Sequence, residues 1–252
     1  MVRLIISFLM LLTTWLLQAQ SSELRKAASF SGIQVSSGVQ VILQPNENGG
    51  IKVETDGTID LKNVYTEVSN NTLKVYIGGA GRRSVSLNKW PAGVNVYVSQ
   101  KDVSRFMAES AGKIKIAKRL KGNKISINLD SAGILDGDFS ATTMVFTLDS
   151  ASVFRGDVQA TKVQVNIDSA AVIDITGEAE ELSLTIDSAA NFRGKSFRVK
   201  KAKVEADSLG KAEVYVTETL DAYADSMGRI FYYGNPKDVK KYTDSMGTVK
   251  AK

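Results

Sequence analysis

Asp168-Ser169-Ala170-Ala171 is one copy of a four-residue motif that recurs through the second half of this 252-residue chain. The other copies are Glu109-Ser110-Ala111-Gly112, Asp130-Ser131-Ala132-Gly133, Asp149-Ser150-Ala151-Ser152, Asp187-Ser188-Ala189-Ala190, Asp207-Ser208-Leu209-Gly210, Asp225-Ser226-Met227-Gly228 and Asp244-Ser245-Met246-Gly247. From serine to serine the steps are 21, 19, 19, 19, 20, 18 and 19 residues. A period near 19 residues built of strand-like segments is typical of a solenoid, in which each repeat forms one coil.

The residues before each motif alternate between apolar and polar side chains. Before Asp168, the side chains of Ile167, Val165 and Val163 are apolar, whereas those of Asn166 and Gln164 are polar. A period of two predicts a strand with one buried face and does not fit a helix. We therefore predict an all-β fold, a parallel β-helix with coils of about 19 residues whose strands stack about 4.8 Å apart.

Stacking in register would place the motif residues in columns at one corner of the coil. These residues are Asp130, Ser131, Asp149, Ser150, Asp168, Ser169, Asp187, Ser188, Asp207, Ser208, Asp225, Ser226, Asp244 and Ser245. We predict that each aspartate caps its own corner through an Asx-type hydrogen bond. A column of carboxylates that collects Ca²⁺ is the alternative. In most coils, the two residues after the serine are predicted to be small because neighbouring backbones approach each other there.

The first 19 residues have the features of a secretory signal peptide. Arg3 precedes an apolar run over residues 4–17, and Gln18-Ala19-Gln20 follows. Fourteen residues are too few to span a bilayer, and no later segment is apolar enough to do so. We expect a secreted protein of the periplasm, the outer-membrane surface or the extracellular space; an N-terminal anchor helix is the alternative.

The rest of the chain divides into two parts. Residues 20–100 contain strand-like segments without the corner motif, and we predict an N-terminal β segment that extends or caps the solenoid. A small separate β domain is the alternative. Residues 101–252 form the predicted repeat array, and their lysine-rich end is expected to act as a C-terminal cap because lysines deter edge-to-edge pairing.

The composition excludes several kinds of site. The chain has no histidine and no cysteine, which excludes Ser-His-Asp and Cys-His catalysis as well as zinc sites built on those ligands. We therefore expect no enzyme, no catalytic residues, no metal site and no cofactor. The formal net charge is +5, but acids and bases are interspersed, so we do not expect a nucleic-acid partner.

Two tyrosines suggest a binding surface. Tyr223 and Tyr242 occupy the same outward slot in successive repeats, 19 residues apart. Such a pair could form an aromatic platform for sugar rings, and the nearby Lys240 and Lys241 would favour acidic sugars. Packing of the last coils is the alternative role. The ligand on this surface is unknown, and a glycan is one candidate.

Three features together resemble the putative auto-transporter adhesin, head GIN domain family of secreted or envelope proteins in Bacteroidetes-type bacteria. They are the segment Phe30-Ser31-Gly32-Ile33-Gln34-Val35-Ser36-Ser37-Gly38-Val39, the segment Thr66-Glu67-Val68-Ser69-Asn70-Asn71-Thr72-Leu73-Lys74-Val75, and the coils with serine followed by small residues. The resemblance implies a right-handed β-helix with a cell-surface role and offers no catalytic residues. This chain has Asp-Ser at corners where Ser-Gly is frequent in the family.

We therefore interpret the chain as a non-enzymatic β-solenoid of the cell envelope that presents an adhesin-like binding surface. Two alternatives remain open. One is a glycan-binding or glycan-degrading β-helix protein, which rests on fold analogy, and the other is a purely structural spacer.

Overall fold

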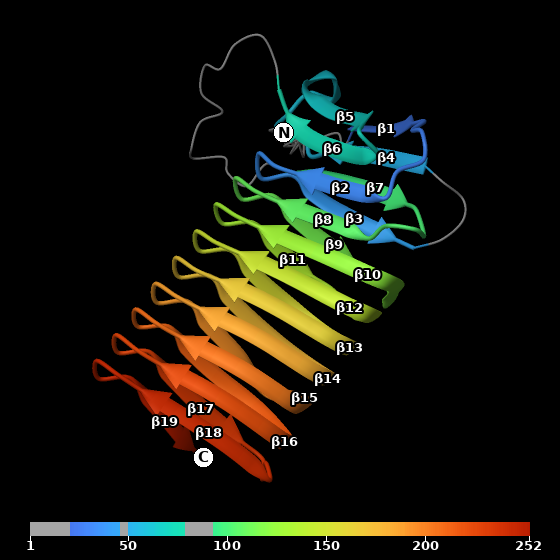
Figure 1. Ribbon diagram of the computed structural model, residues 1–252. Helices are drawn as coiled ribbons and strands as arrows, with labels where there is room; N and C mark the ends of the chain where they lie inside the picture. Colours follow the sequence, from blue (N-terminus) through green and yellow to red (C-terminus); the bar gives the residue numbers. More distant parts are fainter. Residues whose placement is uncertain (1–20, 46–49, 79–92) are drawn as a thin grey trace, which may run out of the picture.

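The computed structural model describes residues 21–45, 50–78 and 93–252, and most of these residues lie in β-strands (Figure 1). The predicted signal peptide, residues 1–19, lies outside the described residues. Within the described ranges, no helix has the length and hydropathy needed to cross a membrane.

The repeat array is a β-solenoid, as the sequence predicts, with about eight coils. Its strands are β8 (Arg105–Ala108), β9 (Lys113–Ile116), β10 (Leu120–Leu129), β11 (Ile134–Asp136), β12 (Phe139–Leu148), β13 (Val153–Ile167), β14 (Val172–Ile186), β15 (Asn191–Ala206), β16 (Lys211–Ala224), β17 (Arg229–Tyr233), β18 (Asp238–Thr243) and β19 (Thr248–Ala251). Each coil pairs in parallel with the next, so that Val153 of β13 lies opposite Val172 of β14 and Ile167 opposite Ile186. The offset between partners is the 19-residue sequence period.

Each coil has two walls that meet at the corner motif. The leading wall consists of the strand residues just before each motif, and the trailing wall consists of those just after it. The corners form a row of pointed loops along one edge of the rod (Figure 1).

The alternating apolar residues face the interior, as predicted. Ile167, Val165 and Val163 are at most 2% exposed, whereas Asn166 and Gln164 between them are exposed. Aromatic rings pack edge-on in the middle of the rod, where Phe146 lies 4.8 Å from Phe154. Fully burying one such side chain contributes about 1.5–3 kcal/mol, so the stacked interior rows are the main source of stability.

The N-terminal part joins the solenoid out of sequence order. Its strands are β1 (Ser21–Arg25), β2 (Gly32–Val35), β3 (Gln40–Gln44), β4 (Gly50–Thr55), β5 (Val64–Ser69), β6 (Thr72–Ile77) and β7 (Val94–Ser99), with a 3-10 turn η1 (Leu61–Asn63) before β5. Strands β2 and β3 form a coil that pairs on one side with β8 and β9 and on the other with β6 and β7, always in parallel. The earliest coil therefore lies between segments that follow it in the sequence.

Antiparallel strands cover the end of the rod beyond this coil. Strand β4 pairs with β7 and with β1, and β5 pairs with β6. Arg25 ties β1 to this end, because its guanidinium donates hydrogen bonds to the carbonyl oxygens of Val64 at 2.6 Å and Leu61 at 2.9 Å. The N-terminal segment thus both extends and covers the solenoid. The direct pairing of β2 with β8 continues the sheet across residue 100, and the domain boundary proposed there stays a prediction.

Candidate binding surfaces

Each corner of the array is a type I′ turn. In the turn Asp130–Gly133, the φ angles of Ser131 and Ala132 are 47° and 61°, and the Gly133 N–H donates to the Asp130 carbonyl oxygen at 2.8 Å. The Ala132 N–H donates to the Ser150 carbonyl oxygen of the next corner at 2.9 Å. The corner is therefore hydrogen bonded both within its own coil and to its neighbour.

Each aspartate side chain accepts a hydrogen bond within its own turn. In all seven Asp-Ser corners, the carboxylate Oδ1 accepts the backbone N–H of the following serine at 2.6–2.7 Å. The Ser169 hydroxyl of the next coil, followed by the Ser150 N–H, keeps the pKa of Asp149 below its ordinary value. The Ser226 N–H, followed by the Ser245 hydroxyl, does the same for Asp225. One oxygen of each carboxylate is thus committed to the corner.

In the described ranges, the corner carboxylates are not arranged as a metal site. There, no group of three or more acidic residues is arranged to hold a metal ion. The corner motif serines are mostly exposed rather than directed into the coil, because two successive left-handed residues turn the chain outward. The capping role of the column stays a structural hypothesis.

Only one of the two positions after the serine must be small. A Cβ atom on Gly133 would lie 2.1 Å from the carbonyl oxygen of Ala108, so the buried second position has no room for a large side chain. The first position is exposed, and Leu209 and Met227 occupy it with 51% and 41% of their surface accessible. The expected close approach of backbones therefore confines the second position, whereas the first is small in most coils but also accepts larger side chains.

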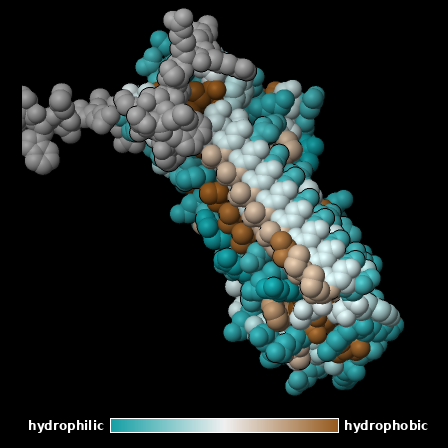
Figure 2. All heavy atoms as spheres, turned by 90° about the vertical axis from the view of Figure 1, so that its left-hand side faces the viewer, coloured by the Kyte–Doolittle hydropathy of each residue, from teal (hydrophilic) through white to brown (hydrophobic). Residues whose placement is uncertain are grey.

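The exposed residues at the first position form an apolar stripe. Figure 2 faces the corners and shows side chains of one kind repeating down the rod, with a tan-to-brown line beside paler rows. The exposed Ala132, Ala151 and Ala170 belong to this position, and the half-buried Val153 and Val172 follow it on the trailing wall. The corner edge thus combines a column of acidic side chains with a column of mostly small apolar side chains.

A column of alternating charge runs along the trailing wall. Its members occupy register-matched outward positions, six residues after the acid of each motif: Lys115, Asp136, Arg155, Asp174, Arg193 and Glu213. Arg155 Nε lies 2.8 Å from Asp136 Oδ1. Opposite charges on adjacent strands stabilise pairing, so this column favours the observed stacking. The alternating charges are present when the repeats are aligned in the sequence. They are hard to recognise there because acidic and basic residues are interspersed along the whole chain.

The two predicted platform tyrosines lie next to each other on the leading wall. Tyr223 pairs in register with Tyr242, and their side chains are 42% and 55% exposed. No ring contact joins them in the described structure, so the two rings do not stack on each other. The Tyr223 hydroxyl donates to Asp225 Oδ2 at 3.3 Å.

The structure brings only one of the two predicted lysines to this pair. Lys240 shares the outward phase of Tyr242, whereas Lys241 alternates to the other side of β18, and its Nζ lies 4.8 Å from the centroid of the Tyr232 ring. Tyr215, Phe231 and Tyr233 in these last coils also lie under lysine or arginine side chains. Tyr223 and Tyr242 have no such partner in the described structure, so their ring faces are open.

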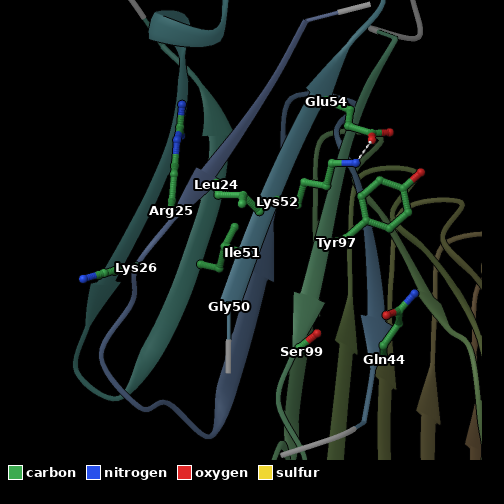
Figure 3. A pocket seen from close by; sticks show the side chains of 10 residues that line it. All are labelled: Leu24, Arg25, Lys26, Gln44, Gly50, Ile51, Lys52, Glu54, Tyr97 and Ser99. Atoms are coloured by element: carbon green, nitrogen blue, oxygen red, sulfur yellow. Dashed lines mark ion pairs between the residues drawn. The ribbon is translucent and has the colours of Figure 1, made fainter. Parts of the chain in front are cut away.

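A groove at the N-terminal end was not predicted from the sequence (Figure 3). It has a volume of about 770 Å³ and is lined by Leu24, Arg25, Lys26, Gln44, Gly50, Ile51, Lys52, Glu54, Tyr97 and Ser99. Leu24, Lys52 and Tyr97 lie in one row across β1, β4 and β7, with Leu24 82% exposed. Burial, followed by the nearby Glu54, raises the pKa of Tyr97. No local motif marks this groove, because antiparallel pairing of distant segments creates it.

Comparisons with known proteins agree with the fold. The sequence profile of the family described as "Putative auto-transporter adhesin, head GIN domain" matches residues 29–236. No curated protein matches the chain. Three solved structures with 18–19% sequence identity show the same fold.

Two of these three structures come from Parabacteroides distasonis. One is named a putative lipid binding protein, with a TM-score of 0.81 and coverage of 92% of this chain and 96% of that chain. The other is named a putative adhesin, with a TM-score of 0.83 and coverage of 93% and 97%. A putative adhesin from Parabacteroides merdae has a TM-score of 0.80 and coverage of 92% and 96%.

Proposed function

The chain belongs to the putative auto-transporter adhesin, head GIN domain family, and from this premise we propose that it is a non-enzymatic, adhesin-like protein of the bacterial cell envelope. The observation that carries this proposal is the exposed pair Tyr223 and Tyr242 on the outer face of a regular rod. Neighbours with this fold from two Parabacteroides species are named putative adhesins, which supports the same role.

The geometry suits ligand binding better than catalysis. A rod of about eight coils at about 4.8 Å per coil is roughly 35–40 Å long and offers an extended surface. The chain contains no histidine or cysteine, and each corner aspartate accepts the N–H of the next residue. Secretion through the segment 1–19 is part of this proposal and places the rod in the periplasm, on the outer-membrane surface or outside the cell.

Replacing both platform tyrosines should abolish most glycan binding. We expect the double variant Tyr223→Ala with Tyr242→Ala to bind glycans at least about tenfold more weakly, because two exposed aromatic faces are lost. The measurement is a glycan array probed with labelled residues 21–252, followed by titration of the strongest ligand. Leu209→Ala with Met227→Ala is the matched control, since it removes exposed apolar surface from the corners that precede the strands of Tyr223 and Tyr242. Equal binding by wild type and the tyrosine variant would leave a structural spacer or another surface as the explanation.

The groove of Figure 3 supports a second candidate, a lipid carrier. Its exposed Leu24 and the aliphatic stem of Lys52 provide apolar contacts. Lys26 provides a cation, whereas the Lys52 ammonium is paired with Glu54. A neighbour of similar fold is named a putative lipid binding protein. A fatty acid combines the two chemistries that this lining offers.

Titration with the fluorescent fatty acid cis-parinaric acid tests this candidate. Leu24→Asp should weaken binding about tenfold or more, because an apolar contact is replaced by a charge of the same sign as the carboxylate. Leu209→Asp, which changes an exposed leucine at a distant corner, is the control and should bind like the wild type. Absence of binding at micromolar concentrations, or equal loss in both variants, would eliminate the lipid role of this groove.

A further inference from the structure

One column of side chains on the leading wall continues through the predicted tyrosine platform. Strand pairing places its members in the same outward slot of successive coils: Asn128, Thr147, Asn166, Thr185, Glu205, Tyr223 and Tyr242. We call these seven residues the track. Its six steps of about 4.8 Å span roughly 29 Å, which is much longer than one sugar ring, so a ligand that used the whole track would have to be a linear chain.

The first four track residues are free to bind. Asn128, Thr147, Asn166 and Thr185 are exposed, and no contact in the described structure engages their side chains. The adjacent outward column in the same coils contains Ser126, Val145, Gln164 and Ser183. These eight positions carry no charge, although 23% of the chain is charged and the trailing wall of the same coils alternates in sign.

The chemistry of these groups matches hydroxyls. Side-chain amides and hydroxyls both donate and accept hydrogen bonds, as sugar hydroxyls do. An array of such groups that leads to two open aromatic rings offers polar contacts at one end and stacking surfaces at the other.

The charges around the tyrosines disfavour an acidic ligand. Asp225 is the main reason that the pKa of Tyr223 lies above its ordinary value, and burial, Asp244 and Asp207 add to the shift. Glu205 precedes the pair in the track and is paired with Lys203 at 2.8 Å. Lys241 lies over Tyr232 instead. The lysines that suggested acidic sugars are therefore outnumbered by carboxylates at this site, and an anionic chain would be repelled.

We propose that the track binds a linear, neutral polysaccharide that lies along the rod, across the coils. Sugar rings stack on Tyr223 and Tyr242, and hydroxyls exchange hydrogen bonds with Asn128, Thr147, Asn166 and Thr185. This inference rests on the proposed adhesin-like function and specifies the ligand class and the surface that binds it.

Affinity electrophoresis in gels that contain a defined polysaccharide tests the track. The neutral probes are hydroxyethylcellulose, linear mannan and amylose, and the acidic probe is polygalacturonate. We expect the wild type to be retarded by at least one neutral probe and less by polygalacturonate. Asn166→Ala with Thr185→Ala should weaken binding to the retarding probe about tenfold, as expected for the loss of two hydrogen-bonding groups, and Tyr223→Ala with Tyr242→Ala should weaken it at least as much.

Thr142→Ala with Thr161→Ala is the matched control, because both threonines are exposed on β12 and β13, two strands that carry track residues, but lie outside the track. Its retardation should equal that of the wild type, and melting temperatures should show that all variants are folded. No retardation by any neutral probe, or retardation unchanged by both track variants, would overturn the track. Binding to polygalacturonate alone, lost on removing the tyrosines, would overturn the neutral ligand while the adhesin-like function stands.

Discussion

Ile167→Asp is expected to unfold the rod or to lower its free energy of unfolding by about 4–6 kcal/mol, since apolar burial is lost and a carboxylate is left without a partner in the interior. Ile167 is 2% exposed and lies between Leu148 and Ile186 of the neighbouring coils. Single domains are commonly stable by only 5–15 kcal/mol. Urea denaturation followed by circular dichroism measures the loss.

Asn166→Asp is the matched control for this prediction. It introduces the same residue one position away, on the exposed face of the same strand, and should change the free energy of unfolding by no more than about 0.5–1 kcal/mol. Similar losses in the two variants would contradict the assignment of inward and outward faces.

Gly133→Leu is expected to cost about 3 kcal/mol or more, because overpacking at a site confined by backbone cannot be relieved by side-chain rotation. The first atom of the new side chain would lie 2.1 Å from the Ala108 carbonyl oxygen. That carbonyl also accepts the Asp130 N–H at 3.0 Å, so moving it away weakens the contact between two coils. Thermal melting and urea denaturation of purified protein measure the effect.

Ala132→Leu provides the comparison. The side chain at position 132 is exposed, and Leu209 has the same position and a φ of 70° in a later coil. We expect a change within about 0.5 kcal/mol. A larger loss for Ala132→Leu than for Gly133→Leu would mean that the two corner positions have been assigned the wrong way round.

The repeat array was predictable because its signals are local and recur. Alternation in a segment such as Val163–Ile167 requires only that one face be buried, and the 19-residue period requires only that successive coils stack. The alternating charges of the trailing-wall column could also be read from the aligned repeats. The outward direction of the serines was not predictable from alternation, because the left-handed φ angles at Ser131 and Ala132 interrupt the period of two.

The sequence by itself determined the β-solenoid, its period, the buried rows and the family, because a repeated local pattern leaves few ways to hide its apolar face. Only the tertiary structure decided that β2 and β3 lie between β6–β7 and β8–β9, that distant strands form the groove beside Leu24, and that Lys241 turns to Tyr232 and away from Tyr242. These features depend on which strand edges meet. A strand's own sequence specifies that it needs a partner, whereas competition among all available edges selects the partner.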